Sequence, residues 1–170
     1  MPKDRANYYF GATAITSPIL GAVLSGLITQ KFENGYGSPK ILPFALILAF
    51  CGMSAAVFVP FVNTPLLCVG LIWVVLFCGA FVLPICTGVW LGKVEAEMRP
   101  RANSIANLCY NLFGFFPAPI LYGFANTVEG SKNSRWGMAL LMYSVALMII
   151  FVVLAIIYDE NVCYRDELFG

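Results

Sequence analysis

The sequence predicts an all-α membrane protein with five transmembrane helices, and two observations support this prediction. Of the 170 residues, 60% are hydrophobic and only 11% are charged, whereas soluble domains are about 45–50% apolar and about 25% charged. The charges are also unevenly placed, because none occurs in residues 6–30, 41–92, 102–128 or 136–158. Uncharged stretches of about 18 or more apolar residues can cross a bilayer as helices. Their continuous, non-alternating hydrophobicity argues against a β-barrel.

The first three spans are predicted at residues 8–28, 41–61 and 66–91. A polar loop over residues 30–40 separates the first span from the second. The uncharged stretch between Lys40 and Lys93 is long enough for two helices, and Asn63-Thr64-Pro65 marks a tight turn between them.

The last two spans are predicted at residues 103–126 and 136–158. A loop over residues 92–101, rich in charge, precedes the fourth span, and a polar tail over residues 159–170 closes the chain. The charged start and the long apolar stretch that follows it predict no cleavable signal peptide.

Loop charges predict the orientation of the chain in the bilayer. On one side lie the cations Lys3, Arg5, Lys132 and Arg135. On the other side lie Lys31, Lys40, Lys93, Arg99, Arg101 and Arg165. Cytoplasmic loops carry an excess of Lys and Arg. We therefore expect the second side, which includes the C-terminus, to face the cytoplasm or an organelle matrix.

Several classes of function receive no support from the composition. The net charge is +1 and there is no Lys/Arg run, so nucleic acid is not expected as a partner. Histidine is absent and no nucleophile–base constellation occurs, so we expect neither an enzyme nor a metal or cofactor site. The six cysteines show no CxxC spacing, and five lie in apolar stretches, which is typical of small buried hydrophobic residues.

Small residues recur every four positions in the first span. Ser17, Gly21 and Ser25 follow this spacing, with Ala22 and Gly26 beside them. Such a row lets another helix approach closely. It serves either helix packing alone or a contact that slides during a conformational change.

Three amides recur every four residues in the fourth span, at Asn103, Asn107 and Asn111, so they share one helix face. Amides in hydrocarbon are costly unless they are hydrogen-bonded. We expect this face to meet another helix or a water-filled cavity. Asn103 and Asn107 lie near the loop, where helix contact or gating suits them. Asn111 and Tyr110 lie deeper and are candidates for a solute pathway, with interhelical hydrogen bonding as the alternative.

Prolines interrupt the same span and the one before it. Pro117 and Pro119 each remove a backbone donor in mid-span, and the third span carries Pro84 together with Thr87 and two glycines. Broken helices often form the moving or binding part of transporters. The alternative is a static kink.

These residues resemble those of one transporter family. Arg99–Asn107, Tyr110–Gly114 and Pro117–Gly123 look like the eleventh helix of Spinster-like members of the major facilitator superfamily. Phe81–Gly88 resembles the tenth helix. Pro18, Gly21 and Gly26, with Lys31 and Gly35-Tyr36, resemble the eighth helix and its cytoplasmic loop. Organic-anion transporters of the superfamily share a similar proline-bearing stretch.

The resemblance implies helices eight to twelve of a fold that moves lipids or organic solutes by alternating access. It makes Tyr110, Asn111 and Thr87 candidates for the substrate pathway, and Pro84, Pro117 and Pro119 candidates for gating. The residues that correspond to its cytoplasmic loop motifs are Gln30, Lys31, Arg99, Arg101, Asn103 and Asn107. Gln30 departs from the family pattern, which has an acidic residue there.

Two hypotheses remain open from the sequence. The chain is either the C-terminal portion of a transporter, completed by missing or partner helices, or a transport-inactive subunit of a larger membrane complex. Under both hypotheses, the partners of the chain are membrane lipids and other membrane helices. A transporter of this type needs the other helices because five helices cannot enclose a midplane site alone.

Overall fold

The computed structural model describes residues 3–32, 35–129, 139, 142–143, 146–147 and 149–157, and every regular element in them is helical. Four helical segments are long and apolar enough to cross a membrane: Tyr8–Thr29, Ile41–Phe61, Pro65–Gly92 and Arg99–Phe124. This confirms the prediction of an all-helical protein and is consistent with a multi-pass membrane protein. Within the predicted fifth span, residues 149–157 are helical, whereas much of its first half and the tail at 159–170 lie outside the described residues.

The first part of the chain forms three long helices. They are α1 (Lys3–Thr29), α2 (Ile41–Phe58) and α3 (Pro65–Gly92). A 3-10 turn, η1 (Gly35–Gly37), lies between α1 and α2, and a second, η2 (Val59–Phe61), follows α2. Gly35 has a φ of +54°, a conformation that glycine adopts without strain.

Prolines determine where α2 ends and where α3 begins. Pro60 follows the last residues of α2 and cannot donate the hydrogen bond that would extend it. Pro65 occupies the first turn of α3, where its missing N–H has no helical partner to lose.

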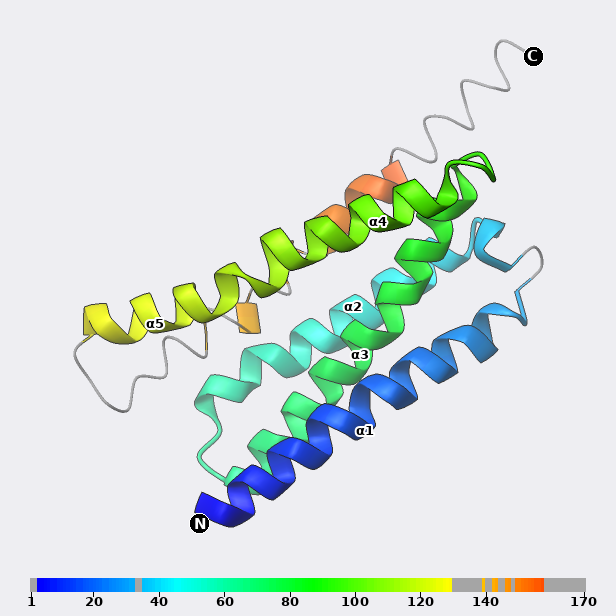
Figure 1. Cartoon of the computed structure of the whole chain (residues 1–170). Helices are drawn as coiled ribbons and strands as arrows, with labels where there is room; N and C mark the ends of the chain where they lie inside the picture. The colour runs from blue at the N-terminus through cyan, green and yellow to red at the C-terminus, as the bar shows by residue number, and fades with distance from the viewer. Residues whose placement is uncertain are drawn as a thin grey trace.

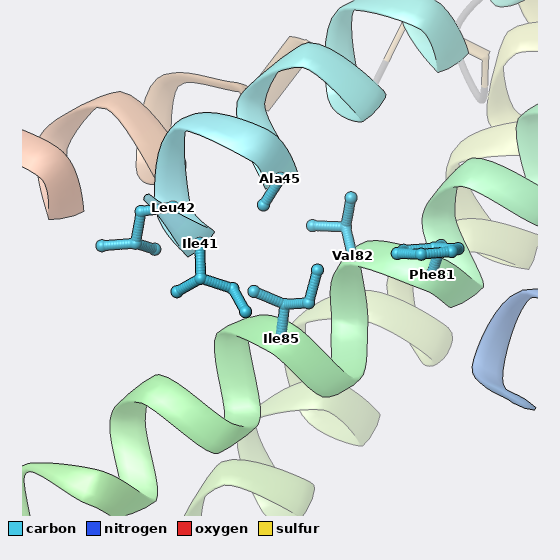
Figure 2. Close-up of a cluster of buried hydrophobic side chains, with 6 residues drawn as sticks. All are labelled: Ile41, Leu42, Ala45, Phe81, Val82 and Ile85. Carbon is cyan, nitrogen blue, oxygen red and sulfur yellow. The ribbon is translucent and has the colours of Figure 1, made fainter. Parts of the chain in front are cut away.

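Helix α3 lies between α1 and α2 (Figure 1). Against α2 it forms a hydrophobic cluster in which Ile41 and Ala45 of α2 face Val82 and Ile85 of α3 (Figure 2). Phe81 and Leu42 complete the cluster. Because these side chains are almost fully buried, the contact between α2 and α3 forms the hydrophobic core of the described structure.

The fourth spanning segment contains α4 (Arg99–Cys109), a π-helical turn η3 (Tyr110–Phe115) and α5 (Pro117–Glu129). No residue of its most apolar 18-residue stretch is buried by the described residues. Figure 1 shows α4 beginning near the end of α3 and continuing through α5 as one long rod. This segment is therefore joined to the other three helices mainly near its start.

Candidate functional site

Two of the predicted pathway residues meet where α3 and α4 approach each other. The Thr87 hydroxyl oxygen lies 3.3 Å from the Tyr110 hydroxyl oxygen. Thr87 also donates a hydrogen bond of 2.9 Å to the Leu83 carbonyl within its own helix. Since the threonine proton is engaged there, Tyr110 is the donor in the contact between the helices. Both residues are half-buried, so this polar pair lies beside the packed interior.

The third predicted pathway residue, Asn111, does not join this pair. Its amide Nδ2 donates a hydrogen bond of 2.8 Å to the Asn107 carbonyl, one turn earlier in the same segment. This bond satisfies one donor of the amide without a second helix. The Oδ1 acceptor of Asn111 has no hydrogen-bond partner among the described residues, so it remains available.

The asparagine row faces away from α1, α2 and α3. Ala102 is buried, and Ala106 and Tyr110 are half-buried, so these three residues form the face of α4 that packs inward. Asn103, Asn107 and Asn111 each follow one of them by a single residue, which is about 100° around a helix, and all three are exposed. The expected contact of this row with another helix is therefore not made within the described residues.

The π-helical turn contains the last asparagine of the row, Asn111, and precedes the two prolines. The Phe116 N–H donates to the Asn111 carbonyl at 2.9 Å, a bond across five residues instead of four. Pro117 then begins α5, and Pro119 follows it. Because neither proline has an N–H, two carbonyls of the preceding turn receive no helical bond from these positions. The turn lets the chain stay helical across this interruption.

Pro84 lies inside α3, which continues as an α-helix from Pro65 to Gly92. One turn earlier in α3, the Phe81 carbonyl accepts a hydrogen bond of 2.8 Å from the Ser25 hydroxyl of α1. The carbonyl that loses its helical bond to Pro84 is that of Ala80, four residues earlier, and not that of Phe81. The structure thus places Pro84 beside a polar contact to α1.

The predicted cytoplasmic loop residues gather at one end of the helices, where α1 and α3 end and α4 begins (Figure 1). The backbone N–H of Gln30 donates to the Gly26 carbonyl at 3.3 Å, and Lys31 follows in a turn. The Arg99 guanidinium donates to the Val94 carbonyl at 3.2 Å and so closes the loop between α3 and α4. Arg101 is exposed.

The small-residue row of α1 packs against α3. The Ser17 hydroxyl donates to the Trp73 carbonyl at 2.7 Å, and Ser25 donates to Phe81 at 2.8 Å. Between them, a Cβ atom on Gly21 would lie only 2.7 Å from the Phe77 carbonyl oxygen. The row also extends in both directions to Thr13 and Thr29, which are buried. The spacing of four continues through these two threonines, so the sequence contained the signal for them.

Other contacts have no clear sequence signal. The Trp73 indole donates to the Thr16 hydroxyl at 3.1 Å. The Tyr36 ring of η1 lies against Gly88, where an added Cβ would come within 2.6 Å of the ring carbon Cγ. Beside this contact is a cavity of about 200 Å³ lined by η1, the start of α2 and the end of α3 with Lys93. A loop of mixed polarity does not by itself predict which helix it contacts.

The five described cysteines are free thiols, of which Cys78 is buried and Cys51 and Cys109 are exposed. Within the part of the chain that the structure describes, no three His, Cys, Asp or Glu side chains are close enough together to hold a metal ion. Cys163 lies outside the described residues.

No family model, curated protein or solved structure matches this chain. The resemblance to Spinster-like transporters therefore rests on the residues quoted from the sequence. What the chain does has to be argued from its own geometry.

Proposed function

We propose that this chain is the C-terminal portion of a transmembrane transporter of the major facilitator type. It moves a lipid-like or organic solute by alternating access, together with missing or partner helices. The observation that supports this proposal best is the exposed asparagine row of α4 beside the Thr87–Tyr110 pair.

The argument begins with the cost of exposed amides. Leaving a polar group unpaired in hydrocarbon costs about 1–3 kcal/mol. The row carries three exposed amides on a segment apolar enough to cross the membrane, and the bond of Asn111 to the Asn107 carbonyl satisfies only one of its donors. A water-filled path or a polar partner helix removes this cost. Because Tyr110 and Asn111 are neighbours, such a path would have hydroxyl and amide groups along one wall.

The interrupted helix adds a second argument. Asn111 lies within the π-helical turn, and Pro117 begins the next helix. Turns of this kind occur frequently at functional sites. Transporter helices that bind substrate at the membrane midplane are often interrupted in this way. We infer that the segment from Tyr110 to Pro119 is where the helix changes shape during transport.

The test compares Asn111→Leu with Leu108→Ala, which alters an exposed apolar side chain of the same helix. Both variants are purified with their native partners and reconstituted into vesicles. Uptake is measured with a fluorescent lysophospholipid and with fluorescein, an organic anion. We expect Asn111→Leu to reduce uptake about tenfold, consistent with the loss of one hydrogen bond to substrate, and Leu108→Ala to leave it unchanged. Unchanged uptake with normal insertion for Asn111→Leu contradicts the pathway.

A specific observation favours a second candidate, a transport-inactive accessory subunit. The seam between α1 and α3 is held by hydroxyl-to-carbonyl bonds and by backbone contact at Gly21. Such a seam resists sliding. Large exposed apolar side chains on α4 and α5, such as Leu108, Ile120 and Phe124, would offer a surface to another subunit.

The native complex separates the two candidates. The chain is purified in mild detergent, its mass is determined, and its partners are identified by mass spectrometry. A stoichiometric partner that supplies about seven membrane helices supports the transporter. Stoichiometric co-purification with a large assembly unrelated to transport contradicts it and supports the accessory subunit.

A further inference from the structure

The cavity beside η1 lies at one end of the membrane-crossing helices. It has a volume of about 200 Å³ and is bounded by η1, the first turn of α2 and the last turn of α3. Because α1, α2 and α3 are all long and apolar enough to span a bilayer, their ends lie at the depth of the lipid headgroups. A ligand in this cavity would be within reach of both water and lipid.

Ser38 offers the most deeply buried hydrogen-bond donor of the cavity wall. It lines the cavity and only 7% of its surface is exposed. Its hydroxyl makes no hydrogen bond within the described residues, although buried polar groups are normally paired. Among the described residues, every fully enclosed polar side-chain atom has a hydrogen-bond partner. Since the Ser38 hydroxyl has none, it is not fully enclosed, and its accessible side opens into the cavity. It can donate to an acceptor placed there.

Among the described residues, the charges around the cavity favour an anionic acceptor. Helix α2 begins at the cavity wall, and no side chain caps its N-terminus. The N–H of Ile41 bonds to the Ser38 carbonyl and Pro43 has no N–H, so the start of α2 attracts an anion mainly through the positive end of the helix dipole. Lys93 lines the opposite wall, and Lys40 is exposed beside the first turn of α2. Glu95 and Glu97 are exposed in the next loop and do not line the cavity.

We propose that this cavity binds the phosphate of an anionic phospholipid headgroup. Ser38 donates a hydrogen bond to a phosphate oxygen, Lys93 supplies the opposite charge, and the start of α2 faces the phosphate. The acyl chains lie along the exposed apolar surface of the helices. Basic pockets at helix ends recognise lipid headgroups in this way. The site lies apart from the Thr87–Tyr110 pair and does not depend on the transport proposal.

The test titrates the purified full chain in non-ionic detergent with phosphatidic acid and counts bound lipid by native mass spectrometry. Diacylglycerol with the same acyl chains lacks the phosphate, and inorganic phosphate lacks the acyl chains. We expect phosphatidic acid to bind about tenfold more tightly than either probe, because only it offers both a charge-assisted hydrogen bond and apolar contact.

Three variants locate the site. Ser38→Ala and Lys93→Gln remove the two polar partners, and each is expected to weaken phosphatidic acid about five- to tenfold. Gly92→Leu fills the cavity, since a Cβ at Gly92 meets no atom within 4 Å. The matched controls are Ser54→Ala and Lys31→Gln, which do not line the cavity and should bind as the unmodified chain does.

Three outcomes would overturn the proposal. Equal affinity for phosphatidic acid and diacylglycerol in the unmodified chain would show that phosphate is not recognised. Displacement of phosphatidic acid by equimolar inorganic phosphate would assign the cavity to free phosphate. Unchanged binding in all three variants would place the lipid elsewhere. The first two measurements need no variant, so they decide the matter even if a substitution prevents folding.

Discussion

At the scale of single residues, Gly21 sets how closely α1 approaches α3. Its neighbours across the seam are backbone atoms, the Phe77 carbonyl oxygen and the Phe81 nitrogen, in addition to the Ala80 methyl. Backbone atoms of a helix cannot move away to make room for an added Cβ atom, whereas the end of a flexible side chain can. The hydrogen bonds of Ser17 and Ser25 on either side depend on this closeness, because a hydroxyl reaches only about 2.7–2.8 Å to a carbonyl oxygen.

Gly21→Ala is expected to destabilise the chain by about 1–3 kcal/mol, the usual cost of overpacking a close contact. Gly26→Ala is the matched control on the same helix, since a Cβ there meets no atom within 4 Å. We expect the control to leave stability unchanged or slightly raised. The measurement is reversible unfolding of each variant in mixed micelles, followed by circular dichroism. Equal stability of the two variants would contradict the close approach.

At the scale of elements, α3 is held between two helix faces made of small residues. On α1 the face consists of Ser17, Gly21, Ser25 and the threonines that extend the row. On α2 it consists of Ala45, Ala49, Gly52 and Ala56, and a Cβ on Gly52 would lie 3.0 Å from the Cys78 Cβ. Lipid is as apolar as the alanines of α2, so close van der Waals packing favours helix over lipid at that face, and the serine hydrogen bonds add to it at the α1 face.

The contact between η1 and α3 is tested by a double-mutant cycle on Gly88 and Tyr36. Gly88→Ala places a methyl group against the Tyr36 ring, and we expect a loss of about 1–3 kcal/mol. Tyr36→Ala removes the ring and its packing. The double variant should lose less than the sum of the single losses, because the clash disappears with the ring. Strict additivity, measured by the same unfolding assay, would show that the loop does not contact Gly88.

The sequence predicted where helices cross the membrane better than where they begin. Charge-free stretches locate the bilayer-crossing residues, but α4 begins at Arg99, earlier than the predicted span at 103, and α1 begins at Lys3. Charged residues are excluded from hydrocarbon, not from helices, so a helix continues into the headgroup region. Hydrophobicity therefore marks the bilayer-crossing part and not the end of the helix.

The candidate site was predicted in part, for a physical reason that concerns helix faces. The spacing placed Asn103, Asn107 and Asn111 on one face, and this follows from helix geometry alone. Which face packs inward depends on the partner helix, and the structure uses Ala102, Ala106 and Tyr110. The pairing of Ser17 with Trp73 was likewise beyond the sequence, because many registers between two apolar helices satisfy the same pattern.

At the scale of the whole molecule, the chain alternates in direction from one spanning helix to the next. Ser17 pairs with Trp73 and Ser25 with Phe81, each across 56 residues, so α1 and α3 run parallel. The loop with η1 and the loop between α3 and α4 therefore lie at one end (Figure 1). The short connection between η2 and α3 lies at the other end.

Cysteine labelling tests this arrangement and its orientation. In a background without native cysteines, Lys40→Cys and Glu97→Cys should react with an impermeant maleimide from the same side of a sealed vesicle. Val62→Cys should react from the opposite side. The excess of loop cations predicts that the first pair is cytoplasmic. Labelling of Lys40→Cys and Glu97→Cys from different sides would contradict the fold itself, whereas reversal of all three would contradict the orientation alone.

The 56-residue offset along the α1–α3 seam also has a consequence for synthesis at the ribosome. Helix α1 packs mainly on α3 within the described residues, so Ser17 and Ser25 must wait until α3 has been made. At about 5–20 residues per second, the interval is about 3–11 s. During that time two serine hydroxyls have no acceptor on a neighbouring helix of their own chain. Until α3 is made, the polar face of α1 would have to be shielded by something other than α3.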